Sequence, residues 1–206
     1  LEVLELITMV VEIPIAYLSS IIARACNHAN NLIGLNIQYG YGGLLNLSIA
    51  ALSAVGAYTT AVLVTKLGAD FFTAIFVSIF MTVIAALLIG IPSLRTRGDY
   101  FAIVTLGFSY IVYAILLNWN DEPIRGALGI PSIKRPVIFG FSFSNFESLM
   151  VLSIVVLFIV FMVAQRIANS PYGRILRAIR EDEDAAMSLG KNTTNYKLSA
   201  FVIGSV

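Results

Sequence analysis

The residue types that most often carry catalysis and metal binding are scarce in this chain of 206 residues. It contains one histidine, His28, and one cysteine, Cys26, and its serines are scattered. A catalytic nucleophile needs a base within reach, and a metal site needs several Cys, His or carboxylate ligands at characteristic spacings. The sequence has neither pattern. We therefore expect no catalytic residues and no metal site, and we predict that the chain itself is not an enzyme.

A glycine cluster is the next candidate site, because glycine-rich loops can cradle phosphates. Gly40, Gly42 and Gly43 lie in the run Gln-Tyr-Gly-Tyr-Gly-Gly, which lacks the Lys and Ser or Thr of a P-loop. We predict that this chain binds no cofactor, and that partner subunits bind and use any ATP. The same glycines could break a helix at membrane depth, which is tolerated only where protein or a cavity covers the backbone.

The densest group of charged side chains lies between residues 170 and 197. Ser170 is a candidate N-cap, Pro171 suits the first helical position, and Gly190 is a candidate residue just past a helix end. We predict a capped helix from Ser170 to Gly190. Because hydrophobic segments flank it on both sides, this charged helix has to lie outside the bilayer.

Acidic residues occupy the middle of this segment, from Glu181 to Asp184, and Ala185 and Ala186 follow them directly. One interpretation is a solvated helix face with no further role. The other is a docking surface, since small residues allow a partner to approach closely and flanking charges fix its orientation. We favour docking of a soluble partner.

The composition places the rest of the chain in a membrane. Apolar residues make up 58% of it and charged residues only 12%, against about a quarter charged in soluble domains. A spanning helix needs roughly 20 apolar residues. The sequence therefore predicts an all-α, polytopic transmembrane helix bundle in a lipid bilayer, with no nucleic-acid partner. We expect a single transmembrane domain, truncated at both ends, with spans near 13–38, 44–65, 71–91, 100–118 and 148–165 and a further span starting at 198–206.

The first of these spans is interrupted by polar residues, among them Arg24, His28 and Asn31. Exposing polar side chains of a spanning helix to lipid costs free energy, so they normally face protein or a water-filled path. Alternatively, the helix from Ile13 ends in an interfacial kink near Cys26. The sequence leaves both interpretations open.

The distribution of Lys and Arg predicts the orientation. The loop at 93–99 and the segment at 166–197 fall on the same side, because two spans separate them. By the positive-inside rule, residues 166–197 are cytoplasmic and the loop at 119–147 is external. The predicted cytoplasmic side holds eight of the thirteen basic residues: Arg95, Arg97, Arg166, Arg174, Arg177, Arg180, Lys191 and Lys197.

Five sequence blocks follow one another along the chain. They are Gly34–Ser48, Gly56–Leu63, Leu94–Phe108, Gly126–Pro131, and Arg177–Gly190 with the Asn-Thr-Thr-Asn-Tyr-Lys run that follows. In this order they resemble the permease subunits of ABC importers of the branched-chain amino acid type, and the resemblance runs from about Leu32 to Val206. The chain departs from the family at Ser48 and Ile49, where Gly-His is usual, and at Asp184, where ABC permeases generally have Glu.

The resemblance implies a subunit of an importer for branched-chain or other hydrophobic amino acids in a prokaryotic plasma (inner) membrane. Its implied partners are a second permease subunit, two ABC ATPase subunits and an external solute-binding protein. The charged segment would then contain a cytoplasmic coupling helix that receives the ATPases. The implied coupling residues are Glu181, Asp182, Glu183, Asp184, Ala185, Ala186 and Gly190, and the candidate translocation-path residues are Asn31, Asn36, Gln38, Gly40, Gly42, Asn46 and Ser48.

Three alternatives stay open. The same machine could import urea, an amide or a sugar. An ion-coupled secondary transporter would need no ATPase, but it is expected to carry acidic residues within its spans. A structural membrane subunit would have no transport path.

Overall fold

The computed structural model describes residues 2–96, 98–119, 124, 126–131, 133, 137–138, 141–143 and 145–206. Arg97, Arg125, Lys134 and Arg135, which entered the orientation count, and much of the predicted external loop at 119–147 lie outside these ranges. The elements in chain order are α1 (Glu2–Leu35), the π-helix η1 (Asn36–Tyr41), α2 (Ile49–Lys66), α3 (Phe71–Ser93), α4 (Asp99–Asn118), the 3₁₀ turn η2 (Gly126–Leu128), β1 (Val137–Ile138), β2 (Phe141–Ser142), α5 (Phe146–Asn169), α6 (Pro171–Glu181), α7 (Glu183–Ser188) and α8 (Thr193–Ser205).

The chain divides into two compact units, which are described separately. Unit 1 comprises residues 1–30 and 135–163, and unit 2 comprises residues 31–134 and 164–206. Unit 2 holds every predicted coupling and path residue. The single-domain expectation stays a prediction.

Unit 1 is formed by most of α1 and α5, with β1 and β2 paired as a short antiparallel ladder. α1 runs without a break through Cys26, so the interpretation of a helix that ends in a kink there is wrong. The Ser19 hydroxyl donates to the carbonyl oxygens of Ile15 and Ala16, and the Arg24 guanidinium reaches the Ser20 carbonyl at 3.4 Å. These polar groups are bonded within their own helix, which lets the helix continue past them.

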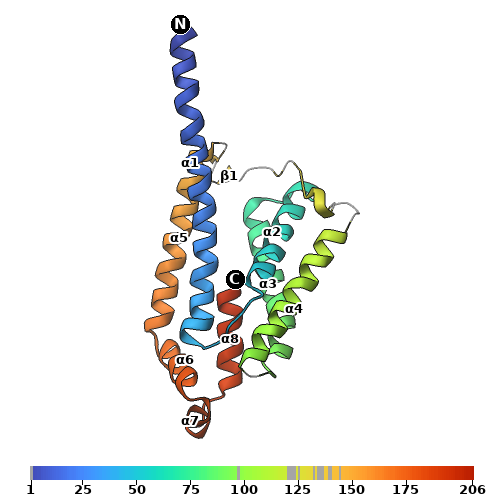
Figure 1. Ribbon diagram of the computed structural model, residues 1–206, viewed down its shortest axis with the longest axis vertical. Helices are drawn as coiled ribbons and strands as arrows, with labels where there is room; N and C mark the ends of the chain where they lie inside the picture. The colour runs from blue at the N-terminus through green and yellow to red at the C-terminus, as the bar shows by residue number, and fades with distance from the viewer. Residues whose placement is uncertain are drawn as a thin grey trace. The chain divides into compact units, whose positions relative to one another are not determined.

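Unit 2 is organised around a core where α2, α3, α4 and α8 meet (Figure 1). Phe101 of α4 and Phe201 of α8 meet edge to face, with ring centroids 6.1 Å apart. A side chain at Gly90 of α3 would collide with the Phe201 ring, so glycine is what lets α8 approach α3. The buried core residues are Leu44, Leu52, Ala86, Ile89, Phe101 and Phe201.

Four helices in the described part of the chain are long and apolar enough to cross a membrane, namely α2, α3, α4 and α5. Large apolar side chains cover their outer faces, and Phe76, Leu88 and Phe158 are each more than 60% exposed. In water this surface would be costly, whereas lipid covers it without penalty. The chain is therefore an all-α, multi-pass membrane protein, which confirms the predicted fold class.

The structure begins α2 at Ile49, five residues later than the predicted span. Gly43 has a positive φ of 68°, and the Asn46 side chain accepts from the Ser48 backbone N–H at 2.8 Å and from the Ser48 hydroxyl at 2.6 Å. This local Asx turn competes with helix formation. Residues 42–48 therefore form a loop, although the predicted span starts at residue 44.

The structure also extends α3 through Pro92 to Ser93, two residues beyond the predicted span at 71–91. Pro92 lies in the last turn, where the helix has little left to propagate. The Ser93 hydroxyl donates to the Ile89 carbonyl at 2.6 Å, and the Leu94 N–H donates to Gly90 at 2.9 Å. The carbonyl groups of Ile89 and Gly90 in the last turn of α3 therefore accept hydrogen bonds, although Pro92 has no N–H to donate.

Candidate functional site

The charged segment folds as two helices, so the single helix predicted from Ser170 to Gly190 is wrong. Ser170 caps α6 by accepting from the Gly173 N–H, and Pro171 is its first residue, as predicted. The chain then leaves helical geometry at Asp182, where φ is −152° and ψ is 104°. Asp182 ends α6 and caps α7, since its Oδ1 accepts from the Ala185 N–H at 2.9 Å. An aspartate that can serve as an N-cap thus divides the segment.

α7 ends in a Schellman motif, as the glycine predicted. The Gly190 N–H donates to the Met187 carbonyl at 2.9 Å, and the Lys191 N–H donates to the Ala186 carbonyl at 3.2 Å. Gly190 has a φ of 75°, a left-handed conformation that glycine adopts without steric cost. α7 is therefore a short helix with a defined cap at each end.

The predicted coupling residues fall on different faces of this segment. Glu181, Asp182, Asp184, Ala185 and Gly190 are exposed, whereas Glu183 is half-buried and Ala186 is 5% exposed. Ala186 therefore packs inward, and Ala185 is the exposed member of the Ala pair. Two apolar side chains that the sequence analysis did not single out, Met187 and Leu189, are 42% and 80% exposed.

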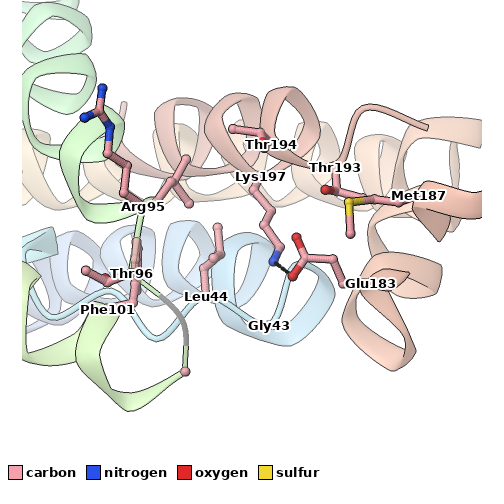
Figure 2. Close-up of a pocket in the computed structure, with 12 residues that line it drawn as sticks. Gly43, Leu44, Arg95, Thr96, Phe101, Glu183, Met187, Thr193, Thr194 and Lys197 are labelled. Atoms are coloured by element: carbon pink, nitrogen blue, oxygen red, sulfur yellow. Dashed lines mark ion pairs between the residues drawn. The ribbon is translucent and has the colours of Figure 1, made fainter. Parts of the chain in front are cut away.

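An ion pair connects α7 to α8. The Lys197 ammonium lies 2.6 Å from a Glu183 carboxylate oxygen, and both side chains are mostly shielded from solvent. This pair lines a pocket of about 310 Å³ beside α7, whose other walls include Leu44, Thr96 and Thr193. Figure 2 shows the Arg95 guanidinium pointing away from the pair. Over the area of this pocket, α7 is not packed against the turn that follows α3.

α6 contacts the end of η1. Arg180 Nη1 donates to the Gly40 carbonyl at 2.5 Å, and the Arg177 guanidinium lies over the Tyr41 ring, 5.7 Å from its centroid. The same Arg177 side chain reaches the Gly173 and Ala168 carbonyls at 3.4 Å. The sequence analysis counted both arginines only for orientation, because nothing local indicates a partner 140 residues away.

α6 is also attached to α8 through Tyr172. Its hydroxyl lies 2.7 Å from the Ser199 hydroxyl, and its ring lies 5.7 Å from that of Tyr196. Burial raises the pKa of Tyr172 above its usual value of about 10, and the Ser199 hydrogen bond opposes this only in part. The phenol therefore stays neutral at physiological pH, and this contact does not titrate there.

Three of the candidate path residues form a buried cluster, here called the amide cluster: Gln38, Asn46 and Ser48. All are at most 1% exposed. The Gln38 Nε2 donates to the Phe201 carbonyl at 2.8 Å and to the Ser205 hydroxyl at 3.0 Å, and its Oε1 accepts from Asn46 Nδ2 at 2.8 Å. The polar groups of the cluster are thus bonded to one another and to α8. Their role in a path stays a prediction.

The remaining candidate path residues lie around this cluster. Asn36 is exposed, Asn31 and Gly40 are half-buried, and Gly42 is buried. A Cβ at Gly40 would lie 2.2 Å from the Asn36 side-chain oxygen, and one at Gly42 would lie 2.8 Å from the Gln38 carbonyl. Glycine is therefore needed at position 42, where a side chain would meet the backbone, whereas the exposed Asn36 side chain could move aside for a side chain at position 40.

Helix α8 crosses the C-terminal part of α1 at two glycines. A Cβ at Gly34 would lie 2.2 Å from the Gly204 carbonyl oxygen, and one at Gly204 would lie 2.5 Å from the Gly34 oxygen. Backbones can approach this closely only where both residues lack side chains. The sequence offered no signal for this pair, because the two residues are far apart in the chain.

Comparison with known proteins gives matches to one kind of protein. Residues 32–206 match the family model described as the permease component of branched-chain amino acid transport systems. The high-affinity branched-chain amino acid transport system permease proteins LivM of Salmonella typhimurium and Escherichia coli are each 39% identical to this chain, over 84% of it and 46% of their own length.

A probable branched-chain amino acid transport permease protein LivM of Methanocaldococcus jannaschii is 28% identical, over 84% of this chain and 59% of its own. The chain thus spans about half the length of the Salmonella typhimurium and Escherichia coli proteins that it matches. No solved structure matches it.

Proposed function

The chain belongs to the family of permease components of branched-chain amino acid transport systems, and from this premise we propose that it is a permease subunit of an ATP-driven importer. Its cargo would be branched-chain or other hydrophobic amino acids. The basis for the cargo is family membership, since the relatives are named for branched-chain amino acid transport. Urea, an amide or a sugar is the alternative cargo within the same machine.

The proposed assembly contains a second permease subunit, two ABC ATPase subunits and an external solute-binding protein. It resides in a prokaryotic plasma membrane, with residues 166–197 in the cytoplasm and 119–147 outside. ATP binds to the ATPase subunits, and this chain holds no cofactor of its own. The positive-inside rule supports the orientation, since residues 166–197 and the loop at 93–99 together carry eight of the thirteen basic residues.

The observation that carries the proposal is the construction of α7. It is a separately capped helix with the exposed Asp184 in its first turn, the exposed Ala185 and the exposed apolar side chains of Met187 and Leu189. Neighbouring exposed apolar side chains outside the spanning helices are one mark of a partner-binding surface. The opposite face of α7 is tied to α8 through Glu183 and Lys197. A partner docked on the open face would therefore move an element that is attached to the bundle.

In the proposed mechanism, closure of the ATPases on ATP displaces α7, and α6 and α8 follow because both contact it. α8 is packed into the core through Phe201 and bonded to Gln38. Its displacement would shift the amide cluster and the loop before α2. The helices would then alternate between outward-open and inward-open arrangements.

The docking role of α7 predicts what Asp184→Arg and Ala185→Trp do in the assembled transporter. The first reverses a charge on the open face of α7, and the second fills the space for close approach. Both should abolish co-purification of the ATPase subunits and ATP-driven uptake, because docking needs complementary charge and shape. Affinity purification through a tag on this chain measures co-purification of the ATPase subunits, and uptake by proteoliposomes measures transport.

Asp70→Arg is the matched control, because Asp70 is also exposed and precedes another helix, α3. It should retain the ATPases. ATPases that remain bound in both α7 variants at wild-type ratio would exclude α7 as the docking element. Uptake that survives in those variants and follows a proton gradient would instead indicate a secondary transporter.

A further inference from the structure

We propose that Arg180 is a positioning residue that fastens the C-terminal end of η1 to the docking segment, so that η1 moves with α6 when α7 is displaced. This inference rests on the proposed function and adds a second route to it. One route enters the bundle through Glu183, Lys197 and α8. The other runs from α6 through Arg180 into η1.

The backbone carbonyl groups at the end of η1 accept hydrogen bonds from two kinds of donor. A helix end leaves carbonyl groups without intrahelical donors. Here the Gln38 carbonyl accepts from the N–H groups of Gly42 and Leu44, and the Tyr39 carbonyl accepts from that of Gly43. The Gly40 carbonyl accepts instead from Arg180. A cation at a helix C-terminus also opposes the negative end of the helix dipole.

The aliphatic part of the Arg180 side chain, here called its stem, packs against the loop that follows η1. Gly43 has a φ of 68°, and a Cβ built on it would lie 3.2 Å from the Arg180 Cγ and 3.6 Å from its Cβ. The aliphatic part of Arg180 thus lies directly against the backbone of the loop that leaves η1. Arg180 therefore holds this turn by two parts of one side chain, its stem and its guanidinium.

Arg180 lies between the docking segment and η1. It lies in the last turn of α6, two residues before the break at Asp182. On the other side, η1 contains Gln38, which bonds Asn46 and the carbonyl of Phe201. π-Helical turns are rare and often occur at functional sites. The geometry connects the hinge of the docking segment to the amide cluster through one guanidinium.

The substitution that tests this is Arg180→Met, which keeps the stem against Gly43 and removes the donor. In proteoliposomes that hold the assembled transporter, it should retain the ATPase subunits and ATP hydrolysis. Leucine taken up per ATP hydrolysed should fall by about tenfold, the scale of one hydrogen bond to a charged group. Arg180→Lys should restore part of this ratio, because an ammonium can donate to the Gly40 carbonyl.

Arg174→Ala is the matched control, since it removes the same charge from an exposed position of the same helix. Its ratio of uptake to hydrolysis should equal that of the wild type. An unchanged ratio in Arg180→Met overturns the proposal. So does loss of assembly in both Arg180→Met and Arg180→Lys, because Arg180 would then be required for folding rather than for coupling.

A distance measurement tests the fastening without relying on transport. Spin labels at Tyr39→Cys in η1 and Ala178→Cys in α6, in a Cys26→Ser background, should give one narrow distance in the assembled transporter, with or without trapped ATP. Arg180→Met should broaden it. A distance that changes on ATP trapping, or that ignores Arg180→Met, overturns the proposal. A wild-type transporter that takes up no leucine would contradict the proposed function, while this distance would still report on Arg180.

Discussion

At the scale of single residues, the amide cluster shows how a membrane protein can bury polar groups at low cost. Gln38 is fully buried, yet its amide nitrogen donates twice and its oxygen accepts once. A buried polar group costs little when its bonds are made and much when a partner is missing. Removing one member of the cluster should therefore lower the stability of the protein, because it leaves other buried polar groups unpaired.

The substitution Gln38→Met is predicted to lower the free energy of unfolding by roughly 1 to 3 kcal/mol, because Asn46 Nδ2 loses its acceptor. Gln38→Glu should lower it further, since a buried carboxylate would face the Phe201 carbonyl. Thermal unfolding of the purified protein in detergent measures both. Gln165→Met on the exposed face of α5 is the matched control, and its effect should stay within about 0.5 kcal/mol. Equal stability of the Gln38 and Gln165 variants would contradict a structural role for the cluster.

Some of these residues could be predicted from the sequence and others could not. Ser170, Pro171 and Gly190 took the expected cap positions, because capping depends on chemistry within one turn of the helix. The contact of Gln38 with Phe201 joins residues 163 positions apart. No local pattern specifies such a pair, so the buried partners of the path candidates could be found only in the folded chain.

At the scale of helices, glycine positions decide which elements approach most closely. α1 and α8 cross at Gly34 and Gly204, α3 admits Phe201 at Gly90, and α2 meets Thr82 of α3 at Gly56. The sequence could not indicate which partner each glycine meets, because helical periodicity indicates a face and not its neighbour.

The glycine crossing predicts opposite outcomes for two identical substitutions. Gly34→Ala should destabilise the protein by about 1 to 3 kcal/mol relative to Gly107→Ala, because its methyl group would collide with the Gly204 carbonyl. A Cβ at Gly107 meets no atom within 4 Å, so that variant keeps the helix-propensity gain of alanine. The melting temperatures of the two variants in detergent measure this difference. Equal melting temperatures would show that α1 and α8 do not cross here.

The break at Asp182 was the main error of the sequence analysis at this scale. Helix propensity favours continuing through Glu181 to Asp184, and the caps at both ends had been identified. A free aspartate side chain can instead accept from the N–H groups of a new helix start, which competes with the continuous helix. The result separates α6, which contacts η1, from α7, which carries the exposed acidic face.

At the scale of the whole molecule, composition predicted the fold class and the membrane, because burying an apolar surface this large in lipid is the only low-energy solution. The family assignment followed from ordered sequence blocks, and the comparisons confirm it. Composition could not indicate that α6, α7, α8 and η1 form one connected group. That connection is the reason why the proposed docking on α7 would affect transport.

The decisive measurement is uptake of labelled leucine by proteoliposomes that contain the assembled transporter, with ATP enclosed and the solute-binding protein added outside or left out. Uptake should require both ATP and the binding protein. Unlabelled isoleucine and valine should compete with leucine, whereas urea and sugars should not. Uptake that needs no ATP and follows a proton gradient would contradict the central claim that this chain is the permease of an ATP-driven importer.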